Sequence, residues 1–242
     1  RKFLLAVGLV LLITGCRGPV SNANLADAQT ALPVRSQLQH YTLDNGLQVY
    51  LLARNQPGVE LRLLVNSGSL QENDQQRGLA HFTEHMAFKG TTHFPGTSGF
   101  KLLEQQGLKL GSHVNAVTSL NATRYQLSMP EASPQQVNTG LQVMADWASH
   151  LSFDAAAFDQ ERQVIVEEWR LRQGVGARIH DSLEKLRYRG SRYAERNPIG
   201  DLDIVREAPI EQAIAYYKTW YQPQRMALVV VGNFNPEKIR QE

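Results

Sequence analysis

Cysteine is almost absent from this sequence: the 242 residues contain one, Cys16. A single cysteine cannot form an intrachain disulfide, and it cannot supply a cysteine-rich zinc site. If the chain binds a metal ion, histidine and carboxylate side chains must therefore hold it.

The sequence also has no large excess of charge of one sign. Its 25 basic residues are scattered among 23 acidic ones, for a net charge of +2. No dense run of Lys and Arg with interleaved aromatic residues occurs, so nucleic acid is not expected as a partner. The hydrophobic content of 42% and the charged content of 20% are typical of a folded globular protein rather than a disordered one.

Long hydrophobic runs are missing as well. The apolar run at residues 3–14 is too short to span a bilayer comfortably, and it follows two basic residues. This pattern predicts an export signal at residues 1–15. Residues 13–16 (ITGC) resemble the lipobox of bacterial lipoproteins, in which the cysteine is acylated, so the resemblance implies lipid attachment at Cys16.

The residue after that cysteine bears on where the protein would be sorted. Arg17, rather than an aspartate, follows Cys16, which by resemblance to Gram-negative sorting implies the periplasmic face of the outer membrane. An uncleaved membrane anchor, or an ordinary signal peptide with an incidental cysteine, are the alternatives. Residues 16–37 are small and polar and are expected to be a flexible tether before a folded domain at 38–242.

The apolar patterning of residues 38–242 alternates between the period of strands and the period of helices. Asn45-Gly46 between two β-rich runs is a strong hairpin signal. Pairs of strands separated by groups of helices predict an α+β fold, with a mainly antiparallel sheet packed against helices. We expect strands at residues 41–43, 47–52, 59–66, 112–119, 123–129 and 226–231, and helices at 77–88, 97–106, 134–150, 154–173, 177–189 and 210–220, with a further helix starting at Pro236.

The chemistry-bearing motif is His81-Phe-Thr-Glu84-His85. On a helix, residues four apart lie one above the other, so His81 and His85 can hold one metal ion. Glu84 lies on the same face, close enough to act as a general base without being a ligand. The order is the H-x-x-E-H of the inverzincins. Taken singly, each histidine would more often be a hydrogen-bonded core or surface residue.

A hydrolytic zinc site also needs a third protein ligand. The expected helix at 154–173 contains Glu161, Glu167 and Glu168. Glu161 and Glu168 are seven residues apart and share a helix face, so one could ligate while the other orients the site. The alternative is that these carboxylates form a solvated helix face, which we favour for Glu167.

A longer stretch around the motif, residues 78–91 (GLAHFTEHMAFKGT), resembles the signature of the pitrilysin/insulinase family of zinc metallopeptidases. Further stretches that agree with the family are residues 45–46, 66–69, 115–118, 123–125, 161–168, 197–200 and 228–232. The resemblance covers nearly everything from Leu38 to the end. It identifies the chain as similar to the N-terminal domain of such a peptidase, the first half of a clamshell, here in a bacterial lipoprotein.

Residue by residue, the resemblance implies that His81, His85 and Glu168 bind one Zn²⁺ ion and that Glu84 is the general base. It further implies that Glu161 steadies the site from behind a ligand. Asn115 and Ala116 would lie on an edge strand that binds substrate by adding it to the sheet, a mode that favours extended peptides. A simple polar turn or strand residue is the alternative for Asn115. His93 and His113 match no ligand position and are interpreted as ordinary polar residues.

The implied function is a zinc-dependent metalloendopeptidase that hydrolyses unfolded peptides or small proteins with a metal-activated water, Glu84 taking its proton. The family's second, homologous half would have to come from the same chain or from a partner subunit, and 38–242 is expected to be truncated. A catalytically idle homologue that serves as a binding or assembly subunit is the alternative function. A structural lipoprotein with a chance motif is a third, which the length of the match leaves little room for.

Overall fold

The computed structural model describes residues 37–241, which belong to one compact unit. The signal peptide predicted at residues 1–15 and the lipid site predicted at Cys16 lie outside the described residues. The same holds for the predicted tether except its last residue. Within the part described, no helix is both long enough and apolar enough to cross a membrane.

Six strands form one sheet in the order β1-β2-β6-β3-β5-β4. All neighbours pair antiparallel except β2 and β6, which are parallel. The predicted α+β class with a mainly antiparallel sheet is therefore confirmed. The strands are β1 (Leu38–Thr42), β2 (Gln48–Ala53), β3 (Val59–Val65), β4 (Val114–Thr118), β5 (Thr123–Met129) and β6 (Met226–Gly232).

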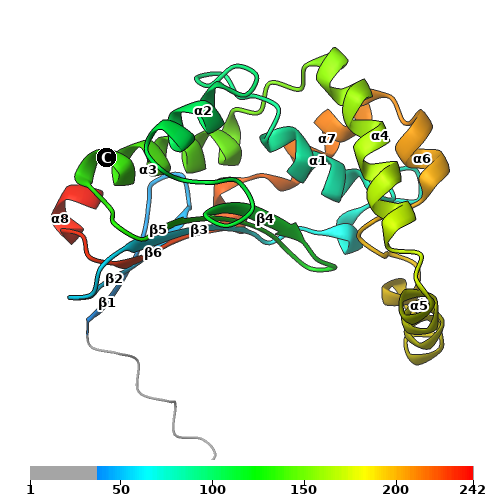
Figure 1. The fold of residues 1–242 in the computed structure, drawn as a ribbon. Helices are drawn as coiled ribbons and strands as arrows, with labels where there is room; N and C mark the ends of the chain where they lie inside the picture. The colour runs from blue at the N-terminus through cyan, green and yellow to red at the C-terminus, as the bar shows by residue number, and fades with distance from the viewer. Residues whose placement is uncertain (1–36, 242) are drawn as a thin grey trace, which may run out of the picture. The chain divides into compact units, whose positions relative to one another are not determined.

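Helices α1, α2, α3 and α7 lie on one face of this sheet (Figure 1). The α-helices are α1 (Leu79–Ala87), α2 (Ser98–Gln105), α3 (Pro134–Ser149), α4 (Ala155–Leu171), α5 (Val175–Arg187), α6 (Leu202–Glu207), α7 (Ile210–Trp220) and α8 (Pro236–Ile239). Short 3₁₀ turns cover Ser69–Gln71, Arg192–Ala194 and Pro223–Arg225.

Alternation along β3 shows how the core forms between the sheet and these helices. Leu61 and Leu63 are buried, whereas Arg62 and Leu64, which point to the other face, are exposed. Since side chains alternate across a strand, one face of the sheet supplies the core. Gly140 of α3 packs directly on this face, because a Cβ there would lie 2.7 Å from Leu61 Cδ1.

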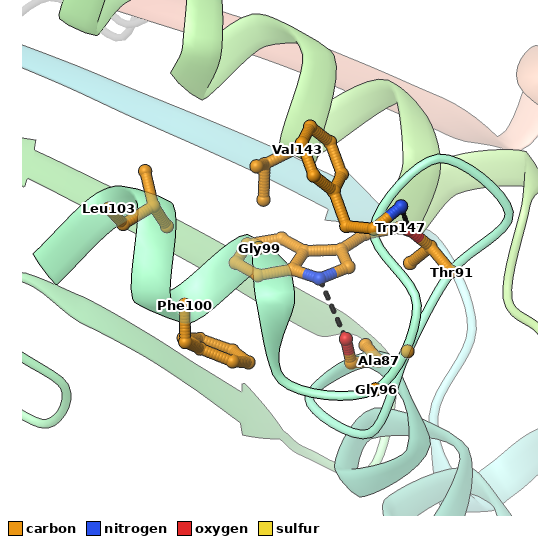
Figure 2. Close-up of a pocket in the computed structure, with 10 residues that line it drawn as sticks. Ala87, Thr91, Gly96, Gly99, Phe100, Leu103, Val143 and Trp147 are labelled. Carbon is orange, nitrogen blue, oxygen red and sulfur yellow. Dashed lines mark hydrogen bonds between the residues drawn. The ribbon is translucent and has the colours of Figure 1, made fainter. Parts of the chain in front are cut away.

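The end of α1 is fixed to α3 by a buried tryptophan. Figure 2 shows Trp147 of α3 with its indole directed at Ala87, and its Nε1 donates a 2.9 Å hydrogen bond to the Ala87 carbonyl. The small cavity beside this contact, ≈ 10 Å³, is lined partly by Phe100 and Leu103 of α2. An indole N–H in the core needs such an acceptor, so this bond positions the C-terminal end of α1.

The structure differs from the sequence expectations at three places. The continuous apolar run of β6 is typical of a fully buried strand, but β6 is buried only at Met226, Val230 and Gly232 and half-buried between them, because one sheet face is open. The helix expected at 154–173 ends earlier, at Leu171 with Arg172 as its C-cap, and Gly174 is instead the N-cap of α5. The short helix α6 was not expected; six residues are too few to show a helical period.

Candidate metal centre

Helix α1 carries the motif, and its first turn is held by groups outside the helix. Gly78 precedes it with φ 103°, a left-handed conformation that glycine adopts without strain. The buried Glu72 accepts hydrogen bonds through Oε1 from the amides of Gly78 and Ala80, at 3.0 and 2.8 Å. These bonds satisfy donors that a helix N-terminus otherwise leaves free.

Three potential ligand atoms converge between α1 and α4. His81, His85 and Glu168 each offer an atom within 4.8 Å of the other two. The two Nε2 atoms are 3.1 Å apart, and Glu168 Oε2 lies 3.5 Å from His81 Nε2 and 3.9 Å from His85 Nε2. Ligands about 2.0–2.2 Å from a tetrahedral zinc ion are about 3.3–3.6 Å apart, so this spacing fits zinc.

Unpartnered polar atoms support the same reading of the site. Glu168 Oε2 is buried without a hydrogen-bond donor, although it faces both imidazoles, and the guanidinium group of Arg172 is 3.7 Å away. A buried carboxylate oxygen without a donor is costly. Burial, together with His85 and Arg172, lowers the pKa of His81 to about 3, which keeps the imidazole neutral. Neutral histidine and carboxylate are the donor set that zinc binds.

Glu161 orients the second histidine from behind. Its Oε1 lies 2.8 Å from His85 Nδ1, and its Oε2 lies 2.5 Å from Lys89 Nζ. Burial alone would raise the pKa of this carboxyl, but the bonds to His85 and Lys89 outweigh burial and hold the pKa below its usual value. The charged carboxylate thus accepts a hydrogen bond from His85 Nδ1–H, which leaves Nε2 free to coordinate a metal ion.

Glu84 lies on α1 beside the ligand atoms and is buried. The hydroxyl of Thr118, at the end of β4, donates to Glu84 Oε2 at 2.5 Å. Burial raises the pKa of Glu84, and the Thr118 bond opposes this shift. The structure therefore places a partly desolvated carboxylate, steadied by one hydroxyl, where the sequence pattern predicts a general base.

The two residues predicted to contact substrate lie on the edge strand. Asn115 and Ala116 are in β4, which is the outermost strand on its side of the sheet, and they are not part of the ligand cluster. Asn115 is exposed, and its Oδ1 accepts a 2.8 Å hydrogen bond from the Ala116 amide. The same strand ends at Thr118, so the sheet edge leads to Glu84.

A groove of ≈ 1090 Å³ begins beside the C-terminal end of α4, the helix that carries Glu168. Trp169 of α4 and its C-cap residue Arg172 line it, with Leu120 from the turn after β4 and residues of α5. Sequence reasoning missed this groove and the supporting roles of Thr118 and Lys89. No sequence spacing predicts them, because their contacts join segments that are far apart in the chain.

Comparison with known proteins gives two family matches. Residues 49–195 match the family Insulinase (Peptidase family M16), and residues 208–241 match the Peptidase M16 inactive domain. The first match contains the whole ligand cluster. The second covers α7, β6 and α8, with the last residues of the unit.

Curated relatives and solved structures agree with these matches. The chain is 37% identical to the probable zinc protease PqqL of Escherichia coli, over 86% of the chain and 23% of PqqL. It is 35% identical to PqqL of Haemophilus influenzae, with the same coverage. The crystal structure of the first half of the periplasmic protease PqqL from E. coli superposes with a TM-score of 0.83 at 36% identity, over 87% of this chain and 45% of that one. The chain thus spans less than a quarter of the length of these curated relatives.

Proposed function

Because the chain belongs to the insulinase family of peptidases, peptidase family M16, we propose that it carries the zinc-binding and proton-transferring part of a metalloendopeptidase. The observation that carries the proposal is the convergence of His81, His85 and Glu168, with Glu168 Oε2 buried and without a hydrogen-bond donor. The relatives named zinc proteases support the metal and the reaction class.

The residues of this chain would divide the work as follows. His81, His85 and Glu168 hold the ion, which supplies a Lewis acid for the scissile carbonyl and its attacking water. Glu84 takes the proton from the nucleophile and returns it to the leaving amine. Thr118 holds Glu84 in place through its hydroxyl.

Substrate would bind along the edge of the sheet. An extended peptide can pair with β4, and the Ala116 amide can exchange its bond to the Asn115 side chain for one to the substrate backbone. This mode requires the substrate to be unfolded locally. The groove next to Trp169 and Arg172 would hold the part of the substrate peptide that extends beyond the metal centre, along α5.

The domains that would complete the protein are inferred from its relatives. The chain covers 45% of the first half of PqqL, so further domains, in the same chain or in a partner subunit, would close the substrate cleft. A catalytically idle homologue that binds zinc or peptide without cleaving it is the alternative, and the match to an inactive domain at residues 208–241 favours testing it.

The test is hydrolysis of an unstructured, internally quenched fluorescent peptide by the zinc-loaded full-length protein. Wild type and Glu167→Gln, which changes an exposed residue of α4, should cleave it, whereas Glu84→Gln should be inactive with an unchanged zinc content by mass spectrometry. Equal cleavage by Glu84→Gln would refute its role as base. Zinc binding without cleavage by wild type would support the idle homologue.

The location is proposed on independent grounds. The relative PqqL of E. coli is a periplasmic protease, and the ITGC pattern supports export with lipid attachment at Cys16 at the outer membrane. In a Gram-negative host, labelled palmitate should enter the wild-type protein and not Cys16→Ser. Equal labelling of both would exclude this attachment.

A further inference from the structure

A second group of metal-ligating side chains lies at the C-terminal end of α3, outside the centre described above. His93, Asp146 and His150 each offer one ligand atom, and these atoms lie within 4.8 Å of one another. Asp146 is on the last turn of α3 and His150 is its C-cap, while His93 belongs to the segment between α1 and α2. The cluster therefore joins two segments that are far apart in sequence.

The two oxygens of the buried Asp146 carboxylate have different partners. Oδ2 accepts from the Thr91 hydroxyl and, at 3.1 Å, from the His93 amide. Oδ1 faces the two imidazoles, with His93 Nδ1 at 2.6 Å and His150 Nδ1 at 3.7 Å. Carboxylates that bind metal ions are usually hydrogen-bonded themselves. The bonds to Oδ2 would therefore hold Asp146 with Oδ1 directed at the two imidazoles.

The surrounding backbone holds these segments together without the histidine side chains. The Thr92 amide donates to the His150 carbonyl at 2.9 Å, and the Ser152 amide donates to the Gly90 carbonyl at 3.2 Å. Trp147, one residue from Asp146, bonds to the end of α1 (Figure 2). The backbone positions of the three residues are therefore fixed in advance, which lowers the entropic cost of binding an ion.

Exposure allows an ion to enter. The side chains of His93 and His150 are 64% and 44% exposed, while that of Asp146 is 4% exposed. Ligand atoms of one zinc ion lie about 3.3 Å apart. A small rotation of the exposed His93 imidazole, which moves Nδ1 away from Oδ1 by less than about 1 Å, would reach this spacing. Two imidazoles and one carboxylate form a donor set suited to Zn²⁺ and neighbouring divalent transition metals.

We propose that His93, Asp146 and His150 form a second site for a divalent transition metal such as Zn²⁺. A bound ion would link the segment after α1 to the end of α3. The site is independent of the proposed proteolytic centre, because it shares no residue with it. This assignment replaces the interpretation of His93 as an ordinary polar residue.

The test measures zinc stoichiometry in the full-length protein by equilibrium dialysis at micromolar free Zn²⁺. Wild type should hold one more ion per chain than the variant His93→Gln/His150→Gln. His180→Gln is the matched control, because His180 is exposed and lies 3.9 Å from a single carboxylate, Asp181. It should bind as much zinc as wild type. Equal stoichiometry of wild type and the double variant would overturn the proposal.

A second measurement separates the two sites. In the His81→Gln/His85→Gln background, which lacks the proposed catalytic ligands, added Zn²⁺ should still raise the melting temperature. Adding His93→Gln and His150→Gln should abolish that rise. If zinc gives no shift in the first background, the proposed site does not bind it, and the His93–Asp146 contact is only an ion pair. Peptide cleavage by His93→Gln/His150→Gln should stay at the wild-type rate, so failure here is distinguishable from failure of the proposed function.

Discussion

Glu161 contacts the proposed zinc ligand His85 on one side and Lys89 on the other. Its contribution to zinc affinity can therefore be measured by substituting Glu161 alone. Glu161→Ala should weaken zinc binding by roughly 10–100-fold, because His85 loses the partner that orients its ring. Glu161→Gln should weaken it less, since an amide oxygen can still accept from Nδ1. Competition with a chelator of known affinity would measure both.

The background for that measurement is His93→Gln/His150→Gln, in which one class of site is titrated. Glu167→Ala is the control, since Glu167 is exposed on the same helix and pairs with Arg170 at 3.4 Å. Wild-type affinity in Glu161→Ala would contradict the orienting role. An equal loss in Glu167→Ala would show that the effect comes from the charge of α4 as a whole.

At this scale the sequence predicted which residues meet but not how they are supported. Spacing along one helix suffices to place His81 and His85 together, and seven-residue spacing puts Glu161 and Glu168 on one face of α4. The choice between those two glutamates came from the family resemblance. In the structure, Glu168 faces the two Nε2 atoms, while Glu161 faces His85 Nδ1. The Thr118 hydroxyl could not be anticipated, because it depends on how β4 lies against α1.

Helix α1 as an element depends on a buried carboxyl at its N-terminus. Burial raises the pKa of Glu72 to about 8, although the amides of Ala80 and Gly78 and the guanidinium groups of Arg196 and Arg77 oppose this shift. A carboxyl whose pKa is higher in the folded than in the unfolded state favours folding at low pH. That contribution is complete below about pH 4.5 and is lost as the pH rises towards 8.

Glu72→Gln tests this dependence, since the amide oxygen can still accept from the first turn of α1. Between pH 5 and pH 8, the unfolding free energy of wild type should fall by roughly 3 kcal/mol relative to Glu72→Gln. Urea denaturation at several pH values in a chelator would measure it. Parallel curves for the two proteins would mean that Glu72 is ionised in the folded state. Arg192 also donates to the Glu72 carbonyl, a backbone contact that the substitution leaves in place.

The elements themselves were largely predictable, for a physical reason. Strands β3 and β5 alternate buried and more exposed residues, and α3 and α7 bury a regular face, so period alone indicates them. Helix α6 and the 3₁₀ turns have too few residues for a period. The order of the strands, with β6 inserted between β2 and β3, was not predicted; it depends on long-range pairing that local patterns do not encode.

At the scale of the whole molecule, metal binding and catalysis should separate. All the proposed ligands, with Glu161, Glu84 and their supports, belong to the unit Ser36–Glu242. Residues 38–242 produced alone should therefore bind zinc at the catalytic centre with an affinity close to that of the full-length protein. Titration of both proteins in the His93→Gln/His150→Gln background against one chelator would compare them. A large loss of affinity in the piece would mean that other domains hold the ligands in place.

Unlike zinc affinity, the rate of hydrolysis should depend on the other domains, because this unit contacts the substrate from one side. The edge strand β4 can pair with one side of an extended peptide, and the groove beside Trp169 is open to solvent. Water that is not excluded weakens every charge interaction at the metal centre. Zinc-loaded residues 38–242 should thus cleave the quenched peptide at least roughly 100-fold more slowly than the full-length protein, a loss of about 2.7 kcal/mol in transition-state stabilisation. Equal rates would show that this single unit already contains everything that the reaction requires.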